Sequence, residues 1–196
     1  LPPAPEPTPP RPLAPSQPQG QEPPARSPLG DDHGAAFLRG RLVHRLLQSL
    51  PAVEPLWRVA AAQRFLALPV HGLTAADQQA ILDETMAVLN HPEFAAIFGP
   101  NSVAEVPVVG LIGGRALSGQ IDRLVVEGNS VLIVDYKTMR PVPVDLASVP
   151  PLYFEQLAAY RAAIAAVFPG KEIRCALLWT DGPLLMPVPP EKLTRD

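Results

Sequence analysis

Cysteine is nearly absent from this sequence. Cys175 is the single cysteine among 196 residues. One thiol excludes an internal disulfide framework, a zinc site with four cysteine ligands and an iron–sulfur cluster held by four cysteines. A chain without disulfides is typical of a reducing compartment, so we expect a cytoplasmic protein. Cys175 lies in an apolar segment, and we predict that it is buried and inert.

Long apolar runs and an excess of one charge are also lacking. The longest apolar runs are interrupted by Arg161, Pro or Gly well before the roughly 18 residues of a membrane span. From residue 39 onward there are 14 Lys and Arg against 15 Asp and Glu, and the net charge of the chain is −3. The sequence therefore has no strongly basic footprint that would by itself indicate nucleic-acid binding. The chain begins at Leu1 and shows no charged and apolar leader, so we expect a piece of a longer protein.

Proline, by contrast, is abundant and unevenly distributed. Residues 1–28 hold 12 of the 27 prolines and few large apolar side chains. Such a segment cannot bury enough surface to offset the entropy of ordering it. We therefore predict a disordered linker over residues 1–34 and one folded domain over residues 35–196. The linker is either a tether to a preceding domain or a docking peptide for a proline-binding groove, and its composition favours the tether.

The first part of the predicted domain has helical spacing of its apolar residues. It predicts helices over residues 35–50, 55–68, 74–89 and, shorter, 91–98. Thr74, with Asp77 three residues later, is the expected N-cap of the third helix. Trp57 in the second helix is expected in the core.

After Pro100 the pattern changes to that of strands. Strands are predicted over residues 103–109, 115–126, 131–134, 173–180 and 184–188, with a helix over residues 153–168. Tyr153 and Trp179 are expected in the core. Helices, then a hairpin, then a helix and further strands predict an α/β fold, in which a small mixed β-sheet is flanked by helices and preceded by a helical segment.

Candidate chemistry lies on the hairpin. Asp135 and Lys137 are two residues apart at the end of an apolar strand, so their side chains share one face of the sheet. The tight turn at Gly128-Asn129 pairs the flanking strands antiparallel, and counting back from it places Asp122 opposite Asp135. Two carboxylates this close repel each other unless a cation lies between them. Mg²⁺ prefers such oxygen ligands.

The hairpin therefore predicts a metal site with Lys137 beside it. Lys137 would orient the attacking water or stabilise negative charge that grows on a phosphate. The alternative is that these residues are ordinary surface charges at strand ends, because an isolated Asp-x-Lys is common by chance. The apolar run before Asp135 and the matching position of Asp122 favour the metal site.

Four motifs now show a family resemblance. Asp122, followed thirteen residues later by Asp135-Tyr136-Lys137, resembles the core of the PD-(D/E)xK nuclease superfamily, which has a restriction-endonuclease-like fold. The motifs resemble in particular the RecB-like branch of that superfamily, in this order: Gly40-Arg41-Leu42-Val43-His44, Gly119-Gln120-Ile121-Asp122-Arg123, Asp135-Tyr136-Lys137-Thr138 and Gln156-Leu157-Ala158-Ala159-Tyr160.

Within that branch, the chain is most similar to the C-terminal nuclease domains of the AddA subunits of bacterial AddAB helicase–nucleases. AddB-type relatives hold an iron–sulfur cluster through four cysteines, which one cysteine cannot do. The proline-rich segment then resembles part of the linker from a preceding helicase.

The resemblance implies a metal site. Its ligands would be His44, Asp122, Asp135 and the backbone carbonyl of Tyr136. Glu105 on the preceding strand either completes the metal shell or faces solvent. The implied cofactor is Mg²⁺, with Mn²⁺ as a substitute and no iron–sulfur cluster.

The remaining site residues are implied in the same way. Gln156 and Tyr160 lie four residues apart, so they share one helix face. Spacing alone indicates a packed tyrosine with a hydrogen-bonded amide, whereas the resemblance implies that both support the site and touch DNA. Arg41 and Arg123 either hold phosphate or pair with the acids.

The resemblance also implies a function. Asp122, Asp135 and Lys137 would make the chain a metal-dependent DNA exonuclease that hydrolyses single-stranded DNA in recombinational repair of double-strand breaks. Its partners would be a DNA end, an AddB-like subunit and a helicase portion of the same chain, at the bacterial nucleoid. Two alternatives remain open: a catalytically silent module that binds DNA or a partner subunit, and a purely structural interaction domain.

Overall fold

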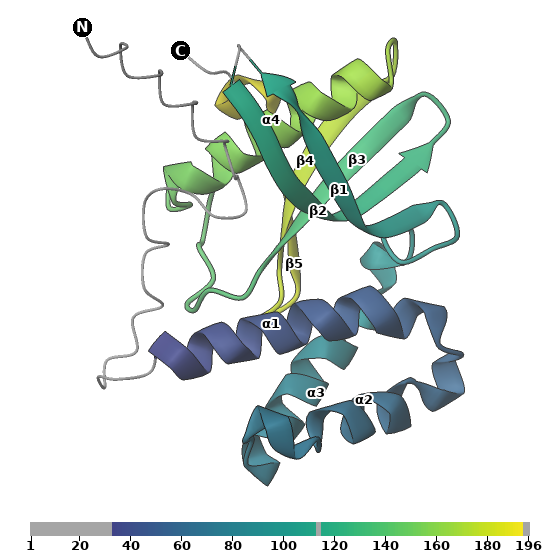
Figure 1. Ribbon diagram of the computed structural model, residues 1–196, viewed down its shortest axis with the longest axis vertical. Coiled ribbons are helices and arrows are strands. Elements are labelled where there is room, and N and C mark those ends of the chain that lie inside the picture. Colours follow the sequence, from purple (N-terminus) through teal and green to yellow (C-terminus); the bar gives the residue numbers. More distant parts are fainter. Residues whose placement is uncertain (1–32, 113–114, 194–196) are drawn as a thin grey trace, which may run out of the picture.

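The computed structural model describes residues 33–112 and 115–193, and its centre is a five-stranded mixed sheet (Figure 1). The strand order is β1-β2-β3-β4-β5. β3 pairs with β4 in parallel, and the other neighbours are antiparallel. The strands are β1 (Ser102–Ile112), β2 (Arg115–Glu127), β3 (Ser130–Lys137), β4 (Glu172–Trp179) and β5 (Leu184–Val188).

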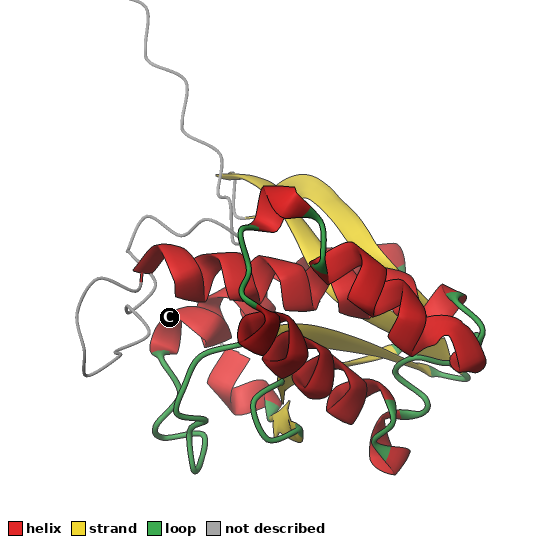
Figure 2. Ribbon diagram, turned by 90° about the horizontal axis from the view of Figure 1, so that it is seen from below, coloured by secondary structure: helices red, strands yellow, loops and turns green. Residues whose placement is uncertain are grey.

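Helices cover both faces of this sheet. The four α-helices are α1 (His33–Ser49), α2 (Arg58–Leu66), α3 (Ala75–Leu89) and α4 (Pro151–Val167). α4 connects the parallel strands β3 and β4 across one face, whereas α1 lies under the other face with α2 and α3 beyond it (Figures 1 and 2). The predicted α/β fold with an N-terminal helical segment is confirmed. Among the described helices, none combines the length and apolar character needed to cross a membrane.

Short 3-10 turns join these elements. They are η1 (Leu50–Ala52), η2 (Pro55–Trp57), η3 (Pro69–His71), η4 (Pro92–Phe94) and η5 (Pro190–Leu193). The predicted N-cap of α3 is present: Asp77 N–H donates to Thr74 Oγ1 at 3.2 Å, and Thr74 N–H donates to Asp77 Oδ2 at 3.1 Å. The predicted linker over 1–34 lies almost wholly outside the described residues, so its boundary stays a prediction.

The apolar core has two parts because β3 and β4 are buried on both faces. On the face under α4, Ile133 and Leu177 pack with Leu157. On the opposite face, Val134 and Leu178 join the side chains of the helical segment. Side chains alternate between the two faces of a strand, so the nearly continuous apolar run of β3 fits its central position.

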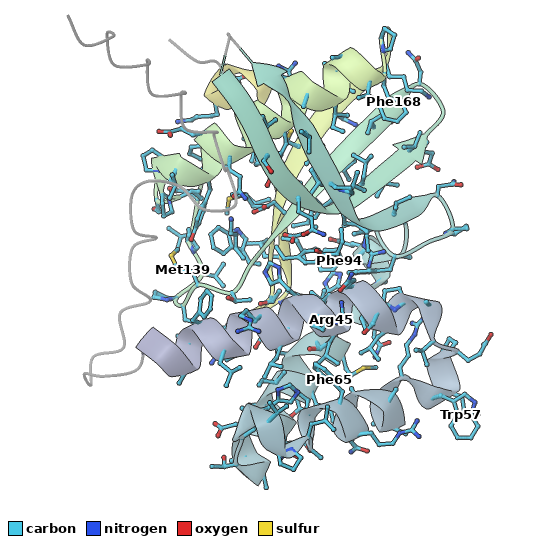
Figure 3. All side chains as sticks on the ribbon, in the orientation of Figure 1. Arg45, Trp57, Phe65, Phe94, Met139 and Phe168 are labelled. Carbon is cyan, nitrogen blue, oxygen red and sulfur yellow. The ribbon has the colours of Figure 1, made fainter. Side chains whose placement is uncertain are left out.

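Two expectations about the helical segment are wrong. The helix expected over 91–98 is only η4, followed by turns, because the chain bends to bury Phe94. Trp57 is 59% exposed instead of buried. It ends η2, just before α2 begins, and its ring lies at the outer corner of the helical segment, away from the sheet (Figure 3).

Candidate active site

Asp122 and Asp135 are brought to neighbouring positions on β2 and β3. The antiparallel ladder pairs Arg123 with Val134, so the next position in the same register places Asp122 opposite Asp135. The Tyr136 N–H donates to Asp122 Oδ2 at 2.7 Å. This hydrogen bond fixes the Asp122 carboxylate against the end of β3.

His44 reaches this pair from α1. Its Nδ1 lies 3.1 Å from Asp122 Oδ1. α1 comes this close because Gly40 has no side chain: a Cβ at this position would lie 2.8 Å from Thr138 Oγ1. The glycine of the Gly-Arg-Leu-Val-His motif thus lets the helix lie close to the end of β3. As a result, the histidine one turn later can reach Asp122.

Lys137 is held from three sides. Its Nζ lies 2.6 Å from Asp135 Oδ2 and donates to Gln156 Oε1 at 3.0 Å. The same ammonium lies 3.8 Å from the centre of the Tyr153 ring, a cation–π contact. Because Gln156 and Tyr153 both belong to α4, the helix after β3 fixes the position of the lysine.

Electrostatic contacts among the site residues counteract the effect of burial on their pKa values. Burial by itself favours the neutral form of Asp122, but His44 and the Tyr136 N–H outweigh it, so the pKa of Asp122 lies below its usual value. Burial disfavours the charged form of His44, yet Asp122 raises the pKa of that ring. The pKa of Lys137 is likewise raised, since the Asp135 carboxylate outweighs the effect of burial.

Glu105 on β1 lies next to Asp122 on the other side. The β1–β2 ladder pairs Ala104 with Arg123 and Val106 with Ile121, which leaves Glu105 and Asp122 facing each other across a break. Glu105 has a φ of 53°, in the left-handed region that is costly for a residue with a side chain. Burial, followed by the nearby Asp122 charge, raises the pKa of Glu105. Backbone strain of this kind is typical of functional sites.

Three other predicted residues lie outside this cluster. The Arg123 guanidinium is buried and donates to the Leu47 carbonyl at 2.6 Å and to the Tyr136 hydroxyl at 3.1 Å. Tyr160 is also buried, and its hydroxyl accepts from the Gln120 N–H at 3.2 Å. In this structure both support β2 from inside the protein. Arg41 is exposed on α1.

The residues present suit a hard divalent cation. In the described part of the chain, no three His, Cys, Asp or Glu side chains form a ready-made metal site. The donors near the strand ends are nevertheless two carboxylates and an imidazole, and Mg²⁺ and Mn²⁺ prefer oxygen-rich ligands of this type. Burial, together with the neighbouring Asp122 charge, raises the pKa of Asp135 despite Lys137, so a cation here would relieve repulsion. Asp135 Oδ2 is buried without a regular hydrogen bond among the described residues, its contact with Lys137 being an ion pair.

A buried ionic cluster close to the site was not anticipated from the sequence. Glu84 of α3 is 8% exposed; it accepts from the Thr180 hydroxyl and pairs with Arg39 of α1 and, at 3.3 Å, with Arg140. Thr180 in turn donates its N–H to the Lys137 carbonyl at 3.0 Å. The sequence feature that could have indicated this cluster is the position of Glu84 on α3: it lies between Ile81 and Val88 at helical spacing, on the apolar face of the helix. A hollow of about 320 Å³ between α2 and α3 is lined by Gln63, Leu66, Gln78 and Leu82 among others, and none of its lining residues belongs to either cluster.

Comparison with known proteins identifies the family of the chain. The model of the PD-(D/E)XK nuclease superfamily matches residues 21–186, which include every residue of the cluster. No curated protein sequence matches the chain. Among solved structures, the crystal structure of SSO0001 is similar at 15% identity over 81% of each chain with a TM-score of 0.33, too slight a likeness to bear on function. The family match covers most of the sequence, and the chain therefore belongs to the PD-(D/E)XK nuclease superfamily.

Proposed function

We propose that this chain is the nuclease domain of a bacterial helicase–nuclease and hydrolyses phosphodiester bonds of single-stranded DNA. The observation that carries the proposal is the convergence of Asp122, Asp135 and Lys137, with His44 from α1 and Gln156 from α4. These residues come from four different elements. Ordinary surface charges are not expected to converge at one buried point.

The acids and the imidazole would hold the divalent cation. Asp122, Asp135 and His44 are the proposed ligands, with the Tyr136 carbonyl and Glu105 as further candidates. When bound, the cation supplies positive charge that favours attack on phosphorus and departure of the 3′ oxygen. Asp122 is already oriented for this role, since the Tyr136 N–H fixes one of its oxygens.

Lys137 would act as a fixed positive charge. Its contact with the Asp135 carboxylate keeps it as an ammonium, which donates hydrogen bonds and accepts no proton. It can therefore orient the attacking water or donate to a phosphate oxygen whose negative charge grows during attack. Gln156 accepts from the same ammonium and so restricts its direction.

The cellular assignment follows from the resemblance of the four motifs. We infer an AddA-type subunit that works in recombinational repair of double-strand breaks, beside an AddB-like partner and a helicase portion of the same chain, in the bacterial cytoplasm. The product would carry a 5′ phosphate. The small net charge of −3 supports a domain that receives its DNA from such partners.

A silent nuclease-like module is the competing function. Loss of an acid or of the lysine would favour it, and all three are present here. The test is cleavage of a linear single-stranded DNA with Mg²⁺ or with EDTA. Lys137→Ala and Asp135→Asn are compared with Lys171→Ala and Asp83→Asn, which change the same residue types far from the cluster.

The outcomes are distinct. Metal-dependent cutting that is lost in both site variants and kept in both controls supports the nuclease, with an expected loss of at least about 100-fold. DNA binding without cutting, in the isolated chain and in the intact helicase–nuclease complex, would establish the silent module instead.

A further inference from the structure

Among the four residues His44, Asp122, Asp135 and Lys137, exposure to solvent is greatest on the α1 side of the candidate site. The side chains of Asp135 and Lys137 are 4% and 8% exposed, whereas those of Asp122 and His44 are 14% and 32% exposed. Exposure therefore rises toward α1, the helix that carries His44. A substrate can therefore reach the cluster along this helix.

The outer surface of α1 carries a stripe of four residues, Phe37, Arg41, Arg45 and Gln48, which we call the α1 stripe. Their spacing of three and four residues places them on successive turns of one helix face. Phe37, Arg41 and Arg45 are exposed, while the opposite face of the helix is buried in the core. His44 lies beside Arg45 and turns toward Asp122.

The two arginines of the α1 stripe are not neutralised by acids. Among the described residues, neither guanidinium forms an ion pair. Arg45 donates to Gln48 on its own helix at 2.5 Å, and the Arg41 guanidinium carbon lies 5.9 Å from the centre of the Phe37 ring.

Other arginines near the site are already engaged. Arg39 and Arg140 pair with Glu84, and Arg123 is buried against Leu47. Phe37 is also unusual, because this large apolar ring is 65% exposed at the end of the stripe. An exposed aromatic ring followed by two guanidinium groups that have no carboxylate partner in the described part of the chain suits single-stranded nucleic acid, which offers bases for stacking and phosphates for ion pairing.

We propose that the α1 stripe is the surface along which single-stranded DNA enters the site, a proposal that rests on the proposed substrate class. Arg41 and Arg45 each bind a backbone phosphate, and Phe37 stacks on a base. Gln48 orients Arg45 through their hydrogen bond. The strand then passes His44, where the scissile phosphate meets Asp122.

The proposal predicts two different signatures in a binding experiment. Binding of a fluorescent single-stranded oligonucleotide is measured by anisotropy in EDTA, which prevents cutting, between about 25 and 200 mM salt. Each phosphate contact to single-stranded DNA contributes about −0.7 to the slope of log K against log salt. Arg41→Gln/Arg45→Gln should therefore reduce the steepness of that slope by about 1.4. Phe37→Ala should weaken binding about fivefold to a hundredfold and leave the slope unchanged.

A charge-matched control separates a local contact from a general effect of charge. Arg64→Gln/Lys171→Gln removes two positive charges from α2 and from the Gly128 end of the sheet. This control should keep the wild-type slope. Equal slopes for the stripe variant and the control, or no measurable binding by the wild-type chain at low salt, would overturn the proposal.

The same experiment distinguishes this proposal from the proposed function. If the wild-type chain cuts DNA but the stripe variants bind and cut normally, the entry surface is wrong and the nuclease stands. If neither the isolated chain nor the intact complex cuts DNA but the stripe variants lose binding as predicted, the entry surface stands and the silent module is correct.

Discussion

The Arg123 guanidinium donates to the Leu47 carbonyl at 2.6 Å and so joins the middle of β2 to the end of α1. The same side chain donates to the Tyr136 hydroxyl and lies 5.1 Å from the centre of the Phe98 ring. Three elements are held by one buried cation. As a result, α1 is positioned so that His44 faces Asp122.

Removal of this cation should destabilise the fold. Arg123→Met keeps much of the side-chain volume but leaves the Leu47 carbonyl and the Tyr136 hydroxyl without their donor. We expect a loss of about 2 to 4 kcal/mol in the free energy of unfolding, measured by urea denaturation. Arg64→Met on the exposed face of α2 should change it by less than about 0.5 kcal/mol. A similar small change for both variants would contradict the structural role of Arg123.

Glu84 should matter for stability as much as a core residue does. Glu84→Gln keeps an acceptor for the Thr180 hydroxyl but leaves the partly buried Arg39 without its counter-charge. Breaking a buried ion pair in this way is expected to cost about 3 kcal/mol. Glu93→Gln, at an exposed position, is the matched control, and thermal or urea unfolding of both variants is the measurement. A Glu84 variant as stable as the control would show that the cluster is not a structural link.

Gly40 should not tolerate a methyl group although it lies within a helix. Alanine favours helix over glycine by about 1 kcal/mol, so Gly34→Ala, where a Cβ meets nothing within 4 Å, should stabilise the protein by up to that amount. Gly40→Ala should instead destabilise it, because the new Cβ collides with Thr138 Oγ1.

A second substitution tests the cause of that collision. Gly40→Ala/Thr138→Ala removes the hydroxyl and should recover most of the lost stability in urea denaturation. If Gly40→Ala alone is as stabilising as Gly34→Ala, the close approach of α1 to β3 is wrong.

Cys175 should be unreactive while the protein is folded. Burial raises the pKa of its thiol to about 12, against about 8.5 in an unfolded chain. The folded protein holds the thiol proton more tightly than the unfolded chain does. The stability that this difference contributes is fully present below a pH of about 8.5 and is lost as the pH rises toward 12. Native protein at pH 8 should react with a disulfide reagent only at its unfolding rate, whereas urea-unfolded protein reacts at once. The stability of Cys175→Ala should depend less on pH above 8.5 than that of the wild type.

Local signals explain which parts of the fold were predictable. The tight turn at Gly128-Asn129 sets the register of the hairpin, so the positions of Asp122 and Asp135 follow from counting along two strands. The side-chain period of a strand places Lys137 beside Asp135 for the same reason. The cap of α3 is equally local, since Thr74 and Asp77 are three residues apart.

Features that depend on how distant elements pack were not predictable. The strand pattern places Arg123 next to Asp122 but does not show that α1 covers its guanidinium. Glu84 lies on the apolar face of α3, but its partners become known only when α1 and the end of β4 are packed against it. The expectation that Trp57 lies in the core is wrong because helical periodicity predicts only which face of a helix is apolar. It does not show whether the start of that helix packs against another element.

The parallel pairing of β3 with β4 has a consequence for when the site forms. Lys137 is the last residue of β3, and its partner Gln156 belongs to the α4 crossover that must close before β4 can add to the sheet. A nascent chain that ends at the hairpin already contains both aspartates and the lysine, yet lacks Gln156 and Tyr153, two of the three partners of the ammonium. Such long-range closure is slow compared with hairpin formation. The proposed active site is therefore complete only after the α4 crossover has closed, one of the later steps in the folding of this domain.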